Sequence, residues 1–252
     1  MTCQPLPLTG KVALITGASA GIGQAVALDL VAQGASVVLQ ARRVERLQTL
    51  AQAITAAGGK ALVCAGDASD MATIDTLMQQ TLAWQGRLDI VVANAGRGLA
   101  GGVMTSDPKV WASLFQVNLT GAVYLMRLAA DYMAKQGHGD IIALGSVAGH
   151  NISPFSGFYG SSKWAVAAAA EALRREVCGR GVRVTTLKPG IVVSEFQDVA
   201  GYNAENFGRS AAKFGTLLQP QDVAKVITFV VSQPAHVHLN EIVLRPTGQD
   251  YP

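Results

Sequence analysis

Short, mainly apolar runs alternate with amphipathic segments along the whole chain. The apolar runs are short enough to be strands, and they cover residues 11–16, 36–41, 61–65, 88–93, 140–146, 182–188 and 241–245. Between them, apolar residues recur at helical spacing, which predicts helices over 22–33, 43–57, 71–84, 108–135, 157–178 and 221–232. The longest of these helices is expected to break or bend near Asn118 and Gly121.

Strands that are apolar throughout and alternate with helices are typical of a parallel sheet covered on both faces. We therefore predict an α/β fold, a Rossmann-like, doubly wound parallel sheet of about seven strands with helices on both faces, in a single domain over residues 1–252. Such a sheet binds ligands at the carboxyl ends of its strands. The stretch 194–218 lacks a clear period, and we expect it to form a substrate loop.

The composition excludes several classes of protein. Half of the residues are hydrophobic and the net charge is only +3, too small an excess to predict nucleic-acid binding. No apolar stretch reaches the ~18 residues of a membrane span, and residues 1–10 lack the apolar run of a signal peptide. Cys3, Cys64 and Cys178 are widely spaced, so neither a disulfide nor a metal site is expected. We expect a cytoplasmic protein with reduced thiols.

A glycine-rich turn follows the first expected strand. Residues 16–23 (TGASAGIG) place three glycines in a GxxxGxG spacing directly before a helix. Glycines allow a close backbone approach to a pyrophosphate, and a helix N-terminus offers it free N–H groups. The alternative is that the glycines only turn a strand into a helix. The expected contacts are Gly17, Ser19, Ala20, Gly21, Ile22 and Gly23.

The end of the second expected strand bears on the choice of dinucleotide. An acidic residue about 20 residues past the glycine turn would bind the ribose 2′-hydroxyl of NAD. Here Ala41 is followed by Arg42 and Arg43, whose guanidinium groups suit a 2′-phosphate. This pattern favours NADP(H). Two alternatives stay open: the arginines are only the solvated start of the next helix, or the protein is an NAD-dependent alcohol dehydrogenase.

Tyr159 and Lys163 are four positions apart, which puts them on one face if the segment is helical. The ordinary tyrosine pKa, about 10, is too high for base catalysis at neutral pH. A lysine ammonium about 5 Å away favours tyrosinate by roughly 3 kcal/mol, so we expect Lys163 to lower the Tyr159 pKa.

Ser146, at the end of the fifth expected strand, could hold a substrate carbonyl or simply cap the turn. Asn118 has the alternative of a core asparagine satisfied by backbone groups.

Taken together, these motifs resemble the short-chain dehydrogenase/reductase family over nearly the whole chain. The resemblance implies that Tyr159 is the general acid/base, Lys163 lowers its pKa and holds the cofactor ribose, and Ser146 orients the substrate oxygen. It also implies that Asn118 anchors a water of a proton relay. The matching pieces follow the family's order: residues 16–23, Asp67, residues 93–96, Asn118, Ser146, Tyr159 with Lys163, and Pro189 with Gly190.

The resemblance also implies further cofactor contacts. They are Asp67 and Ala68 at the adenine, Asn94, Ala95 and Gly96 at the adenosine ribose, and Pro189, Gly190, Val192 and Ser194 at the nicotinamide. Ala93, Ala68 and Ser194 depart from the family's commoner residues, and none of these changes removes a catalytic group. The ending 240–249 (NEIVLRPTGQ) resembles an NADP-dependent branch that includes serine/hydroxy-acid dehydrogenases and clavulanate-forming aldehyde reductases.

The family resemblance predicts an NADPH-dependent oxidoreductase that reduces an aldehyde or ketone to an alcohol, or the reverse. A non-catalytic NADP(H)-binding sensor or scaffold is the alternative from another class. We expect a homo-oligomer, with a tetramer ahead of a dimer. Loops 97–104, 147–158 and 191–215 would line a partly apolar pocket for a small carbonyl or alcohol substrate. Their candidate residues, each with the alternative of ordinary loop packing, are Arg97, His150, Phe155, Phe158, Phe196, Tyr202, Phe207, Arg209 and Phe214.

Overall fold

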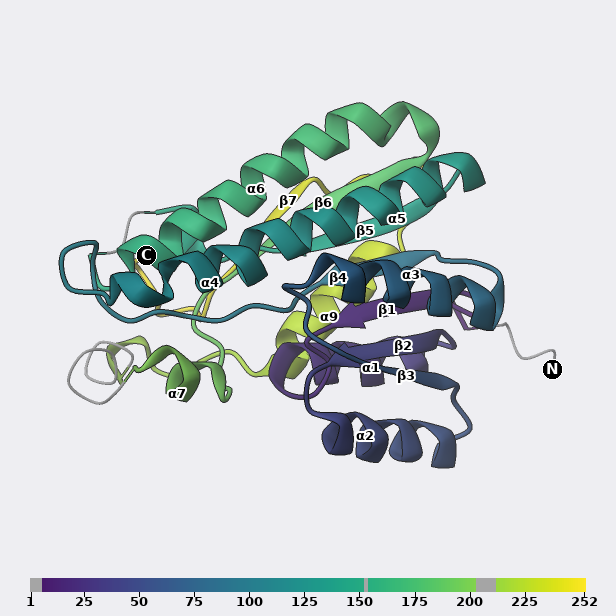
Figure 1. Ribbon diagram of the computed structural model, residues 1–252, viewed down its shortest axis with the longest axis horizontal. Coiled ribbons are helices and arrows are strands. Elements are labelled where there is room, and N and C mark those ends of the chain that lie inside the picture. The colour runs from purple at the N-terminus through teal and green to yellow at the C-terminus, as the bar shows by residue number, and fades with distance from the viewer. Residues whose placement is uncertain (1–5, 152–153, 203–211) are drawn as a thin grey trace.

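Seven parallel strands form one sheet in the order β3-β2-β1-β4-β5-β6-β7 (Figure 1). The computed structural model describes residues 6–151, 154–202 and 212–252. The predicted α/β fold with a doubly wound parallel sheet is confirmed. The strands are β1 (Val12–Thr16), β2 (Ser36–Ala41), β3 (Ala61–Ala65), β4 (Ile90–Ala93), β5 (Gly139–Leu144), β6 (Val182–Pro189) and β7 (Glu241–Leu244).

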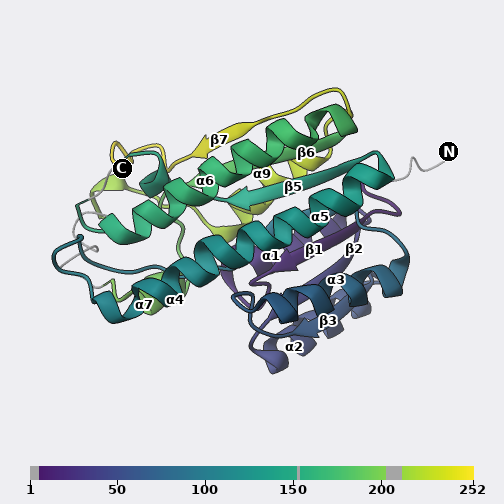
Figure 2. The same ribbon diagram turned by 45° about the horizontal axis from the view of Figure 1, so that its top comes forward.

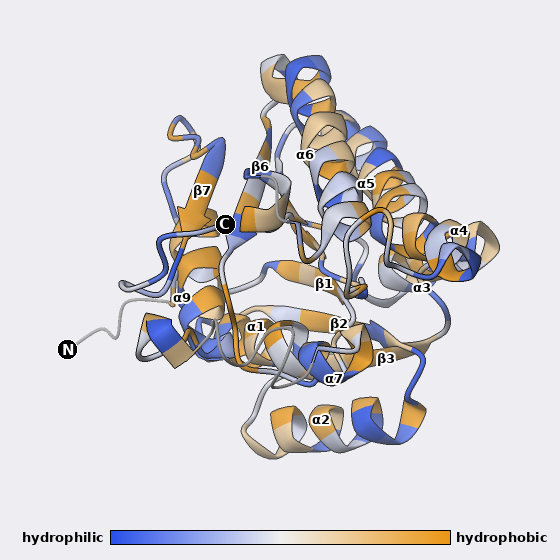
Figure 3. Cartoon of the chain, turned by 90° about the vertical axis from the view of Figure 1, so that its left-hand side faces the viewer, coloured by the Kyte–Doolittle hydropathy of each residue, from blue (hydrophilic) through white to orange (hydrophobic). Residues whose placement is uncertain are grey.

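Helices cover both faces of the sheet (Figure 2). The helices on one face are α1 (Gly21–Ala32), α2 (Val44–Ala56) and α9 (Pro220–Val231). The helices on the other face are α3 (Met71–Gln85), α5 (Ala122–Gln136) and α6 (Gly157–Val177). Because both faces are covered, the inner strands β1 and β4 are buried along their whole length. Figure 3 shows the hydrophobic residues along β1 and β2, between the two helical layers.

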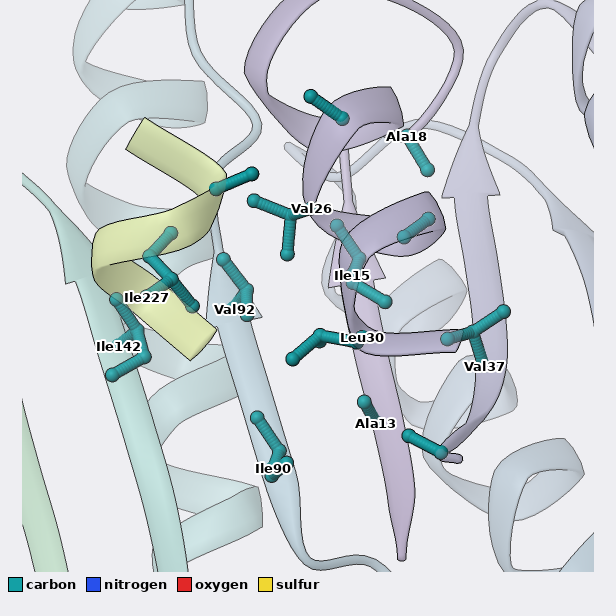
Figure 4. Packing of buried hydrophobic residues seen from close by; sticks show 14 of the residues in the cluster. Ala13, Ile15, Ala18, Val26, Leu30, Val37, Ile90, Val92, Ile142 and Ile227 are labelled. Atoms are coloured by element: carbon teal, nitrogen blue, oxygen red, sulfur yellow. The ribbon is translucent and has the colours of Figure 1, made fainter. Parts of the chain in front are cut away.

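The core under α1 and α9 shows how the helices are held on the sheet. Val26 and Leu30 of α1 and Ile227 of α9 pack toward Ile15 of β1 and Val92 of β4 (Figure 4). All five side chains are completely buried. Burying an aliphatic side chain of this size stabilises the fold by about 1.5–3 kcal/mol. This packing fixes the position of the α1 N-terminus relative to the ends of the strands.

The long helix predicted over 108–135 is interrupted near Asn118 and Gly121, as expected. A 3-10 turn (Pro108–Val110) leads into α4 (Trp111–Phe115), a π-helical stretch (Gln116–Gly121) follows, and α5 continues from there. A Cβ atom on Gly121 would collide with the Ala68 carbonyl oxygen, so this stretch lies tightly against the loop after β3. Short π-helical stretches are frequent at functional sites.

Three predicted segments differ from the structure by more than one residue. Strand β4 begins at Ile90 instead of residue 88. Strand β5 ends at Leu144 instead of residue 146, because Ser146 is the N-cap of a 3-10 turn (Val147–Gly149). The prediction of an irregular stretch over 194–218 is wrong at two places. A short helix, α7 (Phe196–Ala200), and a 3-10 turn (Ala212–Phe214) lie within it.

The core on α1 gives a test of the fold. Leu30→Ala should lower the free energy of unfolding by about 2–5 kcal/mol, because it leaves a cavity between α1 and the sheet. Leu28→Ala, on the same helix with a side chain 43% exposed, is the matched control and should cost under about 1 kcal/mol. Denaturant unfolding measures both. Equal losses in the two variants would contradict this description of the core.

Candidate active site

The glycine turn between β1 and α1 is closed against the end of β4. Gly17 has a φ of +69°, a conformation that favours glycine. A Cβ atom on Gly17 would lie 2.8 Å from the side-chain nitrogen of Asn94, and one on Gly23 would lie 2.7 Å from it. That nitrogen donates a hydrogen bond to the Thr16 carbonyl oxygen at 2.8 Å. The close approach of Asn94 therefore requires glycine at both positions.

Thr16 and Asn94 join the carboxyl ends of β1 and β4, the neighbours between which the strand order reverses. The Thr16 hydroxyl oxygen accepts the backbone N–H groups of Asn94 at 3.1 Å and Ala95 at 3.0 Å. Doubly wound sheets bind their ligands in the crevice at this reversal. The predicted turn residues, which follow β1, thus lie on one side of that crevice. The segment after β4, with Asn94, Ala95 and Gly96, lies on the other side.

The first turn of α1 offers backbone N–H groups that no side chain caps. Its N-cap residue, Ala20, has no polar side chain, and no acidic residue lies in the first turn. A helix N-terminus carries a partial positive charge that attracts anions. Ser19 precedes this end, and Gly21 and Ile22 begin the helix. The uncapped end and the glycine turn fit the pyrophosphate of a dinucleotide.

Two arginines follow β2, and their surroundings differ. Arg43 Nε donates to Ser19 Oγ at 3.1 Å, so its guanidinium lies beside the glycine turn. Its Nη1 also pairs with Glu195 at 2.8 Å. Arg42 is the more exposed of the two and approaches Asp67 at 3.9 Å. Arg43 is therefore the better placed for an anion held at the turn.

Asp67 lies just after β3, and its carboxylate is engaged locally. One oxygen accepts the backbone N–H of Ser69 at 2.9 Å and the Ser69 hydroxyl at 2.8 Å. The backbone hydrogen bond from Ser69 is the main cause that lowers the pKa of Asp67, with smaller contributions from the Ser69 hydroxyl and Arg42. Asp67 is therefore an anion at neutral pH, and Ala68 beside it packs against the π-helical stretch.

Tyr159, Lys163 and Ser146 come together at the carboxyl end of β5. Tyr159 and Lys163 lie on α6, both are buried, and Lys163 Nζ is 5.9 Å from the centre of the Tyr159 ring. Lys163 Nζ donates to the Leu144 carbonyl oxygen at 2.8 Å, which anchors α6 to the end of β5. The Ser146 hydroxyl is hydrogen-bonded to the Tyr159 side chain, and its oxygen also accepts Ala148 N–H at 3.1 Å. Ser146 therefore lies beside Tyr159, where it could hold a substrate carbonyl as predicted. It also caps the turn that follows β5, which was the alternative.

Burial dominates the charge states of this pair. It raises the pKa of Tyr159 well above the ordinary value, and the hydrogen bond from Ser146 offsets only part of that rise. Burial lowers the pKa of Lys163 to about 8. The prediction that Lys163 lowers the Tyr159 pKa below its ordinary value is wrong for the protein chain alone. The physical reason is that both groups share the same dry surroundings, which disfavour tyrosinate and ammonium alike.

Asn118 is buried in the π-helical stretch and has partners for its whole amide. Its oxygen accepts Arg97 N–H at 2.8 Å, and its nitrogen donates to the Arg97 carbonyl at 2.9 Å and to Ser162 Oγ at 3.0 Å. These contacts match the alternative of a core asparagine satisfied by backbone groups. The same side chain borders Lys163, because a Cβ atom on Gly96 would lie 2.9 Å from Asn118 Oδ1 and 3.6 Å from Lys163 Nζ.

The segment after β6 is held by a residue that the sequence analysis did not single out. Gln249 accepts the Ile191 N–H at 3.0 Å, and a Cβ atom on Gly190 would collide with its side-chain oxygen. Val192 is buried and pairs with Leu218 in an isolated bridge. Gln249 belongs to the ending 240–249 noted above, so that signal was available. Glu195 and its partner Arg46 were missed as well, because neither belongs to a recognisable motif.

The predicted substrate loops contribute unequally. The Phe196 ring lies 5.6 Å from the Tyr159 ring, beside the candidate catalytic group. Phe158 instead stacks on Trp111 at 4.2 Å and packs against Phe115, contacts that match the alternative of ordinary loop packing. Of the other candidates, His150 lies 3.7 Å from Glu241 and Phe155 is mostly exposed, whereas Phe207 and Arg209 lie outside the described residues.

Comparison with known proteins identifies the family. The sequence model described as short chain dehydrogenase matches residues 11–203, and the chain belongs to this family of oxidoreductases. The chain is 34% identical over 236 residues to an uncharacterised oxidoreductase of Staphylococcus epidermidis, covering 94% of this chain and 97% of that protein. It is 36% identical over 244 residues to the glycine betaine reductase ATRR of Emericella nidulans. That match covers 96% of this chain and only 19% of the longer reductase.

Solved structures share the fold over nearly the whole chain. The closed form of serine dehydrogenase complexed with NADP+ is 31% identical, with a TM-score of 0.86, covering 95% of this chain and 96% of that chain. The 3-ketoacyl-(acyl-carrier-protein) reductase of Brucella melitensis complexed with NADH is 26% identical, with a TM-score of 0.85, covering 96% of this chain and 99% of that chain. Structures of this family thus include both dinucleotides, so the choice depends on local residues.

Two further findings concern the described residues. None of their helices has the length and apolar character that crossing a membrane requires. Within the same residues, no three His, Cys, Asp or Glu side chains gather in a group that could hold a metal ion.

The buried Lys163 gives a prediction about stability. Because its folded pKa, about 8, lies below the unfolded value, burial of the charged ammonium costs stability in full below about pH 8, and this penalty is relieved as pH rises from about 8 to 10.5. Lys163→Met should therefore raise Tm by a few degrees at pH 7, with a smaller gain at pH 10. The exposed Lys60→Met is the control and should leave Tm unchanged. A lower Tm for Lys163→Met at pH 7 would contradict this view of the site.

Proposed function

We propose that the protein is an NADPH-dependent oxidoreductase that reduces an aldehyde or ketone to an alcohol, or catalyses the reverse reaction. The observation that carries this proposal is the hydrogen bond between the partly exposed Ser146 and the buried Tyr159, beside Lys163 at the carboxyl end of β5. A hydroxyl pair of this kind can hold a carbonyl oxygen and donate a proton to it. The glycine turn on the neighbouring side of the same sheet edge is suited to the dinucleotide.

When bound, NADPH would supply a hydride for the carbonyl carbon. The chain's own residues act on the oxygen: Ser146 orients it by a hydrogen bond, and Tyr159 donates its proton. The raised pKa of Tyr159 keeps that proton on the phenol at neutral pH, which suits the direction of reduction. Lys163, fixed on the Leu144 carbonyl, holds the cofactor ribose beside Tyr159. In the oxidation direction the positive charge of the bound nicotinamide would favour tyrosinate.

The cofactor assignment rests on the residues around the end of β2. The strand ends without an acidic residue, and Arg43 presents its guanidinium beside Ser19 and the α1 N-terminus. A ribose 2′-phosphate there would accept charge-assisted hydrogen bonds from both side chains. NAD(H) carries a neutral 2′-hydroxyl at this position, so it gains no charge-assisted hydrogen bond from an anion there. The NADP+ complex of serine dehydrogenase supports this assignment by analogy.

A homo-oligomer, with a tetramer ahead of a dimer, is part of the proposal. The observation that supports a homo-oligomer is on α6, where Trp164 is 50% exposed and Ala168 is exposed along the same side of the helix. An exposed apolar stripe on a helix is typical of a subunit interface. The substrate is a small carbonyl or alcohol compound, and the cytoplasmic location remains an expectation.

The first test of function removes the proton donor. Tyr159→Phe should lower NADPH-dependent turnover of a responsive aldehyde or ketone by about 10²–10⁴-fold, because the phenol proton is lost, while NADPH binding changes little. Tyr132→Phe removes only an exposed hydroxyl bonded to the Gly86 carbonyl and should leave turnover unchanged. Absorbance of the reduced nicotinamide follows turnover across a panel of aldehydes, ketones and diketones. Activity that survives in Tyr159→Phe would sink the mechanism.

The second test concerns the cofactor. Arg43→Gln should lower kcat/KM for NADPH by roughly 10–100-fold, the value of a lost charge-assisted hydrogen bond, with a much smaller change for NADH. Arg42→Gln should have the smaller effect, because the Arg42 side chain is more exposed and approaches Asp67, whereas Arg43 is hydrogen-bonded to Ser19. Initial rates with each cofactor give the two ratios. If neither variant changes the NADPH-to-NADH ratio, the assignment is wrong.

A further inference from the structure

The Glu195 carboxylate is shared between two arginines. One oxygen lies 2.8 Å from Arg43 Nη1 and the other lies 2.6 Å from Arg46 Nη1. The hydrogen bond from Arg43, followed by that from Arg46, lowers the pKa of Glu195, so it is an anion at neutral pH. All three side chains are about half exposed. The pairs are therefore held in place yet remain open to exchange with another anion.

These pairs connect two distant parts of the chain. Arg43 precedes α2 and also donates to Ser19 of the glycine turn, whereas Glu195 precedes α7 on the segment after β6. Figure 3 looks at the molecule from the side on which α7 lies, and this helix is seen there in front of the layer that contains α1 and α2. Glu195 thus places a carboxylate on the arginine that the proposed function assigns to the 2′-phosphate.

We propose that Glu195 is a cofactor-specificity residue that occupies the 2′-phosphate subsite and is exchanged for the phosphate when NADP(H) binds. This inference rests on the proposed function. A carboxylate and a phosphate are alternative acceptors for the same guanidinium fork. Both cannot remain close to Arg43 Nη1 without strong repulsion between the two anions. Binding of the phosphate therefore releases the Glu195 carboxylate from Arg43.

The exchange has a measurable consequence for selectivity. NADP(H) has to break the Glu195 pairs before it gains its own contacts with Arg43. NAD(H) has no 2′-phosphate, so it leaves these pairs in place. Removal of the carboxylate should consequently strengthen binding of a 2′-phosphate and have little effect on a nucleotide that lacks one. Glu195 then limits the preference for NADP(H) over NAD(H) that Arg43 and Arg46 alone would give.

The experiment compares adenosine 2′,5′-bisphosphate with 5′-AMP, two probes that differ by the 2′-phosphate alone. Isothermal titration of the full chain gives Kd for wild type, Glu195→Gln and Asp198→Asn. Asp198 is the matched control, an exposed acid on α7 that makes no ion pair within the described part of the chain. Glu195→Gln should bind the bisphosphate roughly two- to ten-fold more tightly, the range expected for freeing exposed ion pairs. Its Kd for 5′-AMP, and both values for Asp198→Asn, should stay within about two-fold of wild type.

Three results would overturn the inference. Unchanged bisphosphate binding in Glu195→Gln would mean that the carboxylate does not compete. Weaker binding would mean that Glu195 stays paired and closes over the bound nucleotide. An equal gain in bisphosphate affinity in Asp198→Asn would mean that the effect comes from the change in net charge alone. The proposed function has its own readout in the wild-type protein. If wild type binds the bisphosphate more tightly than 5′-AMP, the proposed function stands in each of these cases. If wild type binds both probes equally, the assignment of NADP(H) as cofactor is wrong.

Discussion

Thr16 and Asn94 hold the carboxyl ends of β1 and β4 together where the strand order reverses, and the rest of the site depends on this contact. It brings a side-chain amide so close to the glycine turn that Gly17 and Gly23 have no room for a Cβ atom. It also fixes the chain that leaves β4, which Asn118 then holds through both backbone groups of Arg97. The two walls of the crevice are thereby built from one network of hydrogen bonds.

The groups proposed for chemistry lie deep, and those proposed for cofactor selection lie at the rim. Tyr159 and Lys163 are enclosed between α6 and the sheet, where burial opposes the charged form of each. This arrangement costs stability and keeps a proton on Tyr159, as reduction of a carbonyl requires. At the rim, Arg43, Arg46 and Glu195 are half exposed, so their pairs are weak and exchangeable. The contrast in burial separates a fixed catalytic centre from an adjustable specificity site.

The sequence was sufficient for the sheet, the helices and the break near Asn118, because apolar periodicity and glycine placement are local signals. The site was predictable where a motif carries it, as for Tyr159 with Lys163 on one helical face. The contacts of single side chains were not predictable, because their partners lie far away in sequence. Phe158 packs on Trp111, and Glu195 pairs with Arg43, more than 150 residues earlier. Likewise, the pKa of Tyr159 follows from burial, which spacing alone does not report.

The central claim is that this chain transfers a hydride from NADPH directly to a carbonyl carbon. The most direct measurement uses NADPH that carries deuterium at both positions of the nicotinamide C4, with a responsive aldehyde or ketone in ordinary water. Mass spectrometry of the alcohol locates the label. Direct hydride transfer predicts one deuterium on the former carbonyl carbon and none in the control with unlabelled NADPH. An alcohol without deuterium would contradict direct hydride transfer and the role of this site.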